Sequence, residues 1–178
     1  MLISLVLPIL LSGIALFFLG FLSWMVLQLH KKDWAEVKDP QALLHDLRKH
    51  DLQSGNYMFP STSPPDENAD DDLSADLKRG PFGVITLFPS PAMGALLGKT
   101  FAYDLVISFC IGYLATLGIE PGADFMTVFR FVSTAAFLTL FAAIVPHSIW
   151  FRNRITGHLI ESLAGAAIVG AIFASLWP

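Results

Sequence analysis

Four ionisable residues within or beside long apolar segments are the groups in this chain best suited to proton transfer or ion binding. They form one candidate polar cluster: Asp104, His147, His158 and Glu161. A charged side chain at the centre of a bilayer costs about 2.5–3.5 kcal/mol on insertion scales, so such residues are the default place to look for function. Carboxylates coupled to a histidine exchange protons near neutral pH, and the same atoms bind cations.

Helical spacing predicts that these residues meet. Polar and small residues recur every four positions in three segments: Thr100, Asp104, Ser108, Gly112 and Thr116; Ala135, Thr139, Ala143 and His147; and Gly157, Glu161 and Gly165. Residues four apart share a helix face, and small or polar faces meet other helices rather than lipid. His158 lies three residues before Glu161 on the same face. We therefore expect three helices to direct a carboxylate, an imidazole and a second carboxylate to one place.

Three interpretations of the cluster stay open. The one that we favour is structural, because polar groups near span ends reach water or hydrogen-bond across helices. The second is a proton or cation site, and the third a divalent metal centre. A separate cation, Arg130, is expected to form an ion pair with Glu120 or Asp124, with anion recognition as its alternative.

The composition predicts that these residues belong to a membrane protein. Of 178 residues, 54% are hydrophobic and only 15% are charged, whereas a globular domain carries about 25% charged residues. The fold class predicted is an all-α membrane protein with four transmembrane helices and an insert between the first two. Its expected divisions are a first helix in 1–29, a polar segment in 30–99 and three helices in 100–178. The expected spans are about 2–29, 100–118, 125–150 and 157–177, since roughly 20 apolar residues cross a bilayer as a helix.

Basic residues predict the orientation. Ten of the 11 Lys and Arg residues lie in the 30–99 segment or in the short link at 151–156. Four spans place these two regions on one side, which the positive-inside rule makes cytoplasmic. Both termini are then expected outside. Within the cytoplasmic segment we expect an amphipathic helix from Pro40 to His50 with Asp39 as its N-cap. We expect an acidic mobile run at 66–72. The apolar piece at 80–98 is expected to form a hairpin or to lie at the membrane interface, and it could also re-enter the membrane.

Several short motifs along most of the chain resemble an uncharacterised family of small bacterial inner-membrane proteins. They are Gly55-Asn56-Tyr57-Met58-Phe59-Pro60, Gly80-Pro81, Met93-Gly94, Pro121-Gly122-Ala123-Asp124, Val128-Phe129-Arg130, Ser148-Ile149-Trp150 and Leu176-Trp177-Pro178. The family has no assigned activity. The resemblance therefore implies a fold and a bacterial inner-membrane location, and it transfers no catalytic residue.

Chemical motifs give little support to an enzyme. The net charge of −4 argues against a nucleic-acid surface, a single cysteine excludes a multi-cysteine zinc site, and no nucleophile elbow, phosphate loop or zincin motif occurs. We predict no cofactor. The leading hypothesis is a non-enzymatic accessory or assembly subunit that acts through a membrane-protein partner or a homo-oligomer in the bilayer. The alternatives are a small proton- or cation-coupled transporter that uses Asp104, His147 and Glu161, and a cofactor-carrying subunit.

Overall fold

The computed structural model describes residues 2–60, 79–89 and 92–178, in two units that are considered separately here. One unit is a helix bundle made of residues 1–35 and 93–178, and the other comprises Glu36–Ala92. The bundle thus includes the residues just after the first helix and just before residue 100, which the sequence divisions gave to the polar segment. The acidic run predicted at 66–72 lies outside the described residues.

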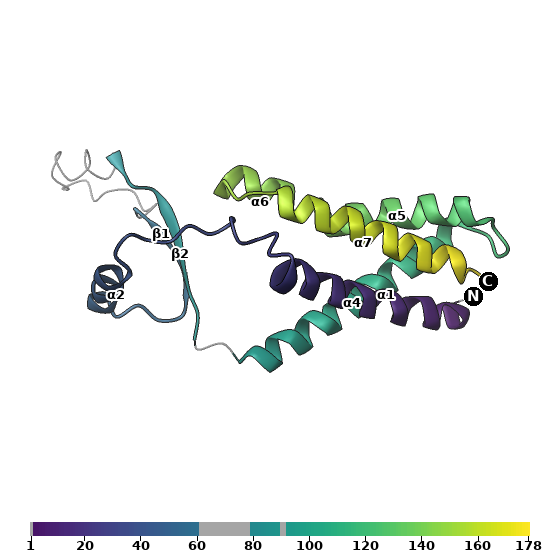
Figure 1. Ribbon diagram of the computed structural model, residues 1–178, viewed down its shortest axis with the longest axis horizontal. Coiled ribbons are helices and arrows are strands. Elements are labelled where there is room, and N and C mark those ends of the chain that lie inside the picture. The colour runs from purple at the N-terminus through teal and green to yellow at the C-terminus, as the bar shows by residue number, and fades with distance from the viewer. Residues whose placement is uncertain (1, 61–78, 90–91) are drawn as a thin grey trace, which may run out of the picture. The chain divides into compact units, whose positions relative to one another are not determined.

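The bundle consists of helical segments, whose bounds are η1 Leu2–Leu5, α1 Val6–Phe21, η2 Leu22–Val26, α4 Met93–Gly118, α5 Phe125–Phe141, α6 Ile144–Phe151 and α7 Thr156–Ser175. In the bundle, α5 and α7 lie side by side and α4 crosses α1 obliquely (Figure 1). In the described part of the chain, four continuous stretches are long and apolar enough to cross a membrane: Ile3–Val26, Met93–Gly118, Phe125–Phe151 and Thr156–Ser175. These are the four spans expected from the sequence, and the chain is mostly helical.

Small residues allow the helices to pack closely. Helix α7 lies along α5 and also contacts α1, while α4 packs against α1 and α5. A β-carbon on Gly13 of α1 would lie 2.6 Å from Leu105 Cδ2 of α4, so this crossing requires a glycine. Fully buried Val132, Val169 and Phe173 fill the centre between the helices. Polar Asp104 and Ser108 of α4 are buried in the same interface, as the spacing of the polar face predicted.

The third span is divided into two helices, α5 and α6, beside a proline. Helix α5 ends at Phe141 and α6 begins at Ile144, with Ala142 and Ala143 between them. Pro146 has no N–H to donate to the carbonyl of Ala142, so the hydrogen-bond ladder is interrupted one turn before the proline. Ala142 and Ala143 nevertheless keep right-handed helical dihedral angles, so the span continues from α5 into α6.

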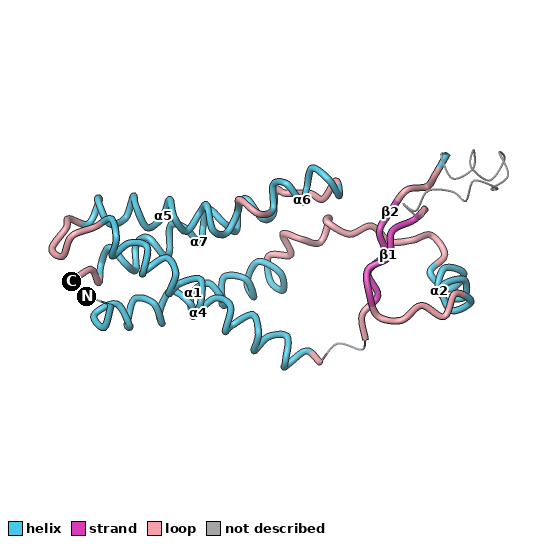
Figure 2. The backbone as a smooth tube through the Cα atoms, turned by 180° about the vertical axis from the view of Figure 1, so that it is seen from behind, coloured by secondary structure: helices cyan, strands magenta, loops and turns pink. Residues whose placement is uncertain are grey.

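Both termini lie at the same end of the bundle (Figure 2). The loop between α4 and α5 is at this end, where Gly122 has a φ of +77° that favours glycine. Gly122 N donates to the Pro178 carbonyl at 2.6 Å, and Trp177 Nε1 donates to the Glu120 carbonyl at 3.0 Å. These two bonds fasten the C-terminal residues to the loop.

Among its described residues, the second unit contains α2 Pro40–Lys49, β1 Gly55–Phe59 and β2 Gly83–Leu87. The amphipathic helix is confirmed, and its predicted cap Asp39 accepts a hydrogen bond from Ala42 N at 2.9 Å. Strands β1 and β2 pair antiparallel, with Gly55 opposite Leu87 and Phe59 opposite Gly83. The fold is therefore not all-α, because a small sheet joins two segments that are distant in sequence.

The predicted apolar piece at 80–98 is divided between two elements. Its first part forms β2, and its last part is the first turn and a half of α4, which begins at Met93 rather than near residue 100. The prolines of this piece, at 81, 89 and 91, all precede Met93. Gly94 and Gly98 each cost about 1 kcal/mol in a helix, which a 26-residue helix tolerates.

Candidate functional site: a polar cluster at one end of the helix bundle

A change of helix type at the end of the first span brings His30 into the bundle. Residues Leu22–Val26 form a π-helical segment, in which Leu27 N bonds to the Leu22 carbonyl at 2.8 Å. Such segments widen a helix by one residue per turn and occur often at functional sites. Gln28 then takes a left-handed φ of +50°, which ends the helix and turns the chain back. His30 is thereby only 2% exposed.

The imidazole of His30 lies between two carboxylates. Its Nδ1 is 2.8 Å from Asp33 Oδ2, and its Nε2 is 2.9 Å from Glu161 Oε2 of α7. A neutral imidazole has a single N–H, so two such bonds require either an imidazolium or a proton on one carboxyl group. Ser23 Oγ also donates to Glu161 Oε2, at 2.6 Å. Glu161 is therefore fixed by two donors from the end of the first span.

Three neighbours hold the His30 ring in place. The indole of Trp24 stacks on it, with ring centroids 4.1 Å apart and planes 15° apart. The ring of His158 lies on its other side, at 4.4 Å between centroids. Gly157 provides the room, because a β-carbon there would lie 3.0 Å from His30 Cε1 and 3.1 Å from the Leu29 carbonyl. We call His30, Asp33, His158 and Glu161 the polar cluster hereafter. It shares only His158 and Glu161 with the candidate cluster that the sequence predicted.

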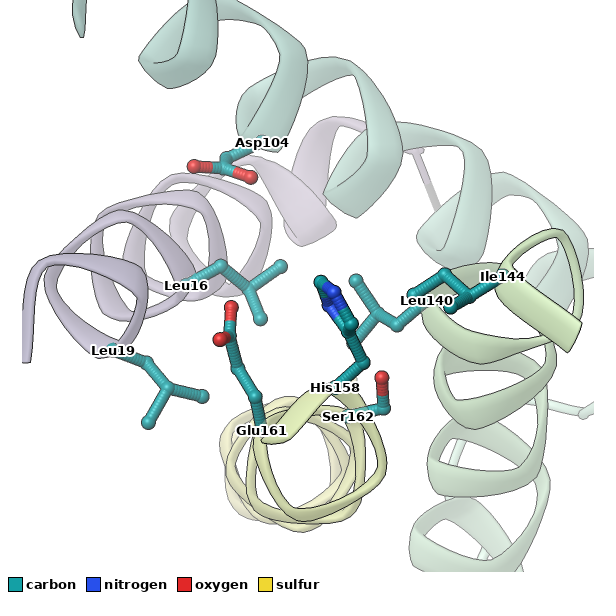
Figure 3. Close-up of a pocket in the computed structure, with 8 residues that line it drawn as sticks. All are labelled: Leu16, Leu19, Asp104, Leu140, Ile144, His158, Glu161 and Ser162. Atoms are coloured by element: carbon teal, nitrogen blue, oxygen red, sulfur yellow. The ribbon is translucent and has the colours of Figure 1, made fainter. Parts of the chain in front are cut away.

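A cavity of about 90 Å³ adjoins the polar cluster inside the bundle. Figure 3 shows His158 and Glu161 on α7 facing it, with Asp104 of α4 on the opposite side. The remaining lining residues come from α1, α5, α6 and α7: Leu16, Leu19, Leu140, Ile144 and Ser162. A cavity of this size with several polar groups can hold a few water molecules. The site is thus a polar chamber within a largely apolar bundle.

Three of the four residues in the candidate cluster predicted from the sequence lie together in the structure. Asp104, His158 and Glu161 all line the cavity. His147 does not: it is exposed, and its ring lies 4.6 Å from that of Phe151. The prediction for His147 assumed that every fourth residue from Ala135 onward keeps to one buried face. Residues four apart drift by about 40° around a helix, and Thr139 and Ala143 of this row are already exposed. The row therefore turns away from the bundle before it reaches His147.

The proposed ion pair of Arg130 is absent from the described residues, in which no bridge joins this guanidinium to Glu120 or Asp124. Asp124 instead caps α5, where it accepts hydrogen bonds from Met126 N and from both N and Oγ1 of Thr127. The Thr127 hydroxyl and the backbone donors lower the pKa of the Asp124 carboxyl below its ordinary value. Its charge therefore serves the helix N-terminus.

Sequence reasoning missed His30, Asp33, Ser23 and Trp24. His30 lies one residue beyond the expected end of the first span, where a polar residue is normally read as the start of a solvated loop. The available signal was the spacing of His30 and Asp33, three residues apart directly after an uncharged helix. Only the π-helical segment, which local sequence does not reveal, shows that this pair folds back onto α7.

Fold and site together define a mostly helical chain with four potential membrane spans and an acid–imidazole cluster at one end of the bundle. No family model, curated protein or solved structure matches the chain. The functional argument therefore depends on the site itself.

Proposed function

We propose that this chain is a small integral membrane protein that binds a cation within its helix bundle and carries it across the membrane. The observation that supports this most directly is the convergence of Asp104, His158 and Glu161 on one cavity inside an apolar bundle. Ionisable groups in such places are costly, about 2.5–3.5 kcal/mol each on insertion scales, and are retained where they serve a pathway or a bound ion.

Charge in the site favours a cation over an anion. The polar cluster and its cavity together contain three carboxylates, those of Asp33, Asp104 and Glu161, and two imidazoles. Lys and Arg side chains are absent from the lining of the cavity among the described residues. Carboxylate oxygens and imidazole nitrogens are suitable cation ligands, and the cavity has room for an ion with part of its water.

Buried hydroxyl groups extend the polar surface deeper into the bundle. Ser108 lies one helical turn beyond Asp104 on α4, and Ser12 lies one turn beyond Leu16 on α1. Both hydroxyls are completely buried and have no hydrogen-bond partner among the described residues. Buried polar groups normally find a partner, so these two hydroxyls would gain one from a water molecule or a passing ion. Their position favours transport over a static ion site.

The distribution of basic residues indicates on which side of the membrane the site lies. We propose that the protein resides in a bacterial inner membrane with both termini outside. Ten of its 11 Lys and Arg residues lie in the segment 30–99 or in the link at 151–156, and the positive-inside rule makes these regions cytoplasmic. In that orientation the polar cluster opens toward the cytoplasm.

Reconstitution of the full chain into liposomes tests the proposed transport. Gradients of Na⁺, K⁺, Mg²⁺, Mn²⁺ and Zn²⁺ are imposed in turn, and flux is followed with an ion-selective dye trapped inside. We expect flux of at least one cation that falls at least tenfold in Asp104→Asn and Glu161→Gln. The control Asp46→Asn changes an exposed carboxylate that pairs with Lys49 in α2 and is expected to leave flux unchanged. Flux no greater than that of empty vesicles, or equal in all variants, would overturn the proposal.

A second candidate function is that of an accessory or assembly subunit. It is favoured by exposed apolar side chains in the unit Glu36–Ala92: Leu43, Leu44, Met58, Phe82, Val84 and Phe88. Exposed apolar side chains become favourable where a partner or a membrane covers them. Native mass determination in mild detergent tests this function. A stoichiometric second protein supports it, and a monomer or homo-oligomer without a partner contradicts it.

A further inference from the structure

We propose that His30, Asp33 and His158 form a binding site for a divalent transition-metal ion, with Glu161 as the carboxylate that orients His30. This inference names the class of cation and thus rests on the proposed function, but the site is argued from its own geometry. One ring nitrogen of His30, one carboxylate oxygen of Asp33 and one ring nitrogen of His158 all lie within 4.8 Å of one another. Two imidazoles and one carboxylate are a ligand set that suits zinc and iron.

Distances within this triad are close to those of a metal site. His30 Nδ1 and Asp33 Oδ2 are 2.8 Å apart, and His158 Nε2 and Asp33 Oδ2 are 4.0 Å apart. Ligand atoms about 2.0–2.1 Å from a tetrahedral zinc ion are about 3.3–3.4 Å from one another. One pair must therefore open by about half an ångström and the other must close by a similar amount. Asp33 lies in the turn after the first span, and we expect a rotation of its side chain to bring both distances toward this value.

Glu161 prepares His30 to be a ligand. A metal-binding histidine almost always donates its second ring N–H to a carboxylate or carbonyl, which fixes its tautomer and its orientation. Glu161 Oε2 accepts this bond at His30 Nε2, which leaves Nδ1 directed at Asp33. Ser23 holds Glu161 in turn, and the stacked indole of Trp24 fixes the plane of the ring. The support around His30 is thus that of a ligand rather than of a simple ion pair.

Access and charge also suit a metal. The side chain of His158 is 31% exposed, whereas that of His30 is 1% exposed, so the triad has one open side and one rigid side. Three protein ligands leave a fourth position for water, as in sites that exchange their ion or use it. Asp33 and Glu161 together supply the negative charge that balances a divalent ion. A bound ion would also tie the end of the first span to the start of α7.

Titration of the full chain in detergent with Co²⁺, a spectroscopic substitute for zinc, tests this assignment. We expect one Co²⁺ per chain with visible absorption typical of four ligands, and its displacement by Zn²⁺. Asp33→Asn and His158→Asn, which are partly exposed positions, are expected to weaken binding at least 100-fold. Glu161→Gln is expected to weaken it 10–100-fold at unchanged stoichiometry, as loss of an orienting partner does. His147→Asn and His45→Asn, both outside the triad, serve as controls, and size-exclusion profiles verify folding.

Outcomes separate this inference from the proposed function. No stoichiometric Co²⁺ or Zn²⁺ binding, or binding that persists in Asp33→Asn and His158→Asn, overturns the metal site. If flux of another cation still depends on Asp104 and Glu161, the proposed transport stands without it. Conversely, metal binding that requires the triad, in a protein without cation flux, supports the metal site and contradicts transport.

Discussion

Gly157→Ala tests whether His30 is held as rigidly as its contacts indicate. The added β-carbon would lie 3.0 Å from His30 Cε1 and 3.1 Å from the Leu29 carbonyl oxygen, so one of these groups must move by a few tenths of an ångström. The carbonyl belongs to the backbone. The ring is fixed by Asp33 and Glu161 at its two nitrogens, so any displacement weakens both hydrogen bonds.

The magnitude follows from opposing effects. Alanine in place of a helical glycine stabilises by about 0.5–1 kcal/mol through lower chain entropy. A hydrogen bond to a charged group contributes about 1.5–3 kcal/mol, and a ring shift weakens two of them. We therefore expect the free energy of unfolding of Gly157→Ala to fall by about 1–3 kcal/mol. The result is a destabilised protein in spite of the better helix former.

Unfolding in mixed micelles, followed by tryptophan fluorescence, measures this difference. Gly98→Ala is the matched control, because it lies in helix α4 and no atom is within 4 Å of its added β-carbon. The control is expected to be as stable as the wild type or up to about 1 kcal/mol more stable. If Gly157→Ala matches Gly98→Ala in stability, His30 is not confined as described, and the argument for an ordered site is refuted.

Three further predictions concern the bundle and its loops. Ser23→Ala removes a buried donor from the site's glutamate and is expected to cost about 1.5–3 kcal/mol in the same unfolding assay; an unchanged value would mean that this bond is not formed. Gly13→Ala places a β-carbon 2.6 Å from Leu105 Cδ2 and 3.1 Å from its Cα, so overpacking of about 1–3 kcal/mol is expected, and a stable variant would refute the close α1–α4 crossing. Because Thr127 lowers the pKa of Asp124 in the folded state, the cap stabilises fully above the ordinary aspartate pKa of 3.8 and is lost as the pH falls through the lowered value. Acid titration of the melting temperature should show this loss in the wild type, and the same acid slope in Asp124→Ala would contradict it.

Long-range periodicity made the bundle predictable. Four apolar stretches separated by polar or glycine-containing links indicate four spans, and the described part of the chain has four helices of that kind. The recurrence of Asp104, Ser108 and Gly112 at every fourth position identified the buried face of α4 correctly. The capping pattern of Asp39 and Pro40 likewise identified α2. These features depend on local sequence alone, which is why they could be found.

The prediction for His147 failed because a row of residues four apart drifts around a helix, and Thr139 and Ala143 in this row are exposed as well. Features that depend on a break in regular geometry were not predictable. His30 and Asp33 reach the site through a π-helical segment and a left-handed residue, Gln28. Strand β1 pairs with a partner 24 or more residues away, so its local sequence gave no sign of a sheet. In each case the decisive contact is tertiary.

Thermal unfolding of the purified chain in the presence of cations tests the central claim, that the end of the bundle is a cation site, most directly. A ligand at 100 times its dissociation constant stabilises the folded state by about 2.7 kcal/mol. We predict that one cation from a panel of monovalent and divalent ions raises the melting temperature of the wild type. The same cation should have no effect on a protein that carries both Asp104→Asn and Glu161→Gln. A wild type that no cation stabilises, or a double variant that responds equally, would contradict the account.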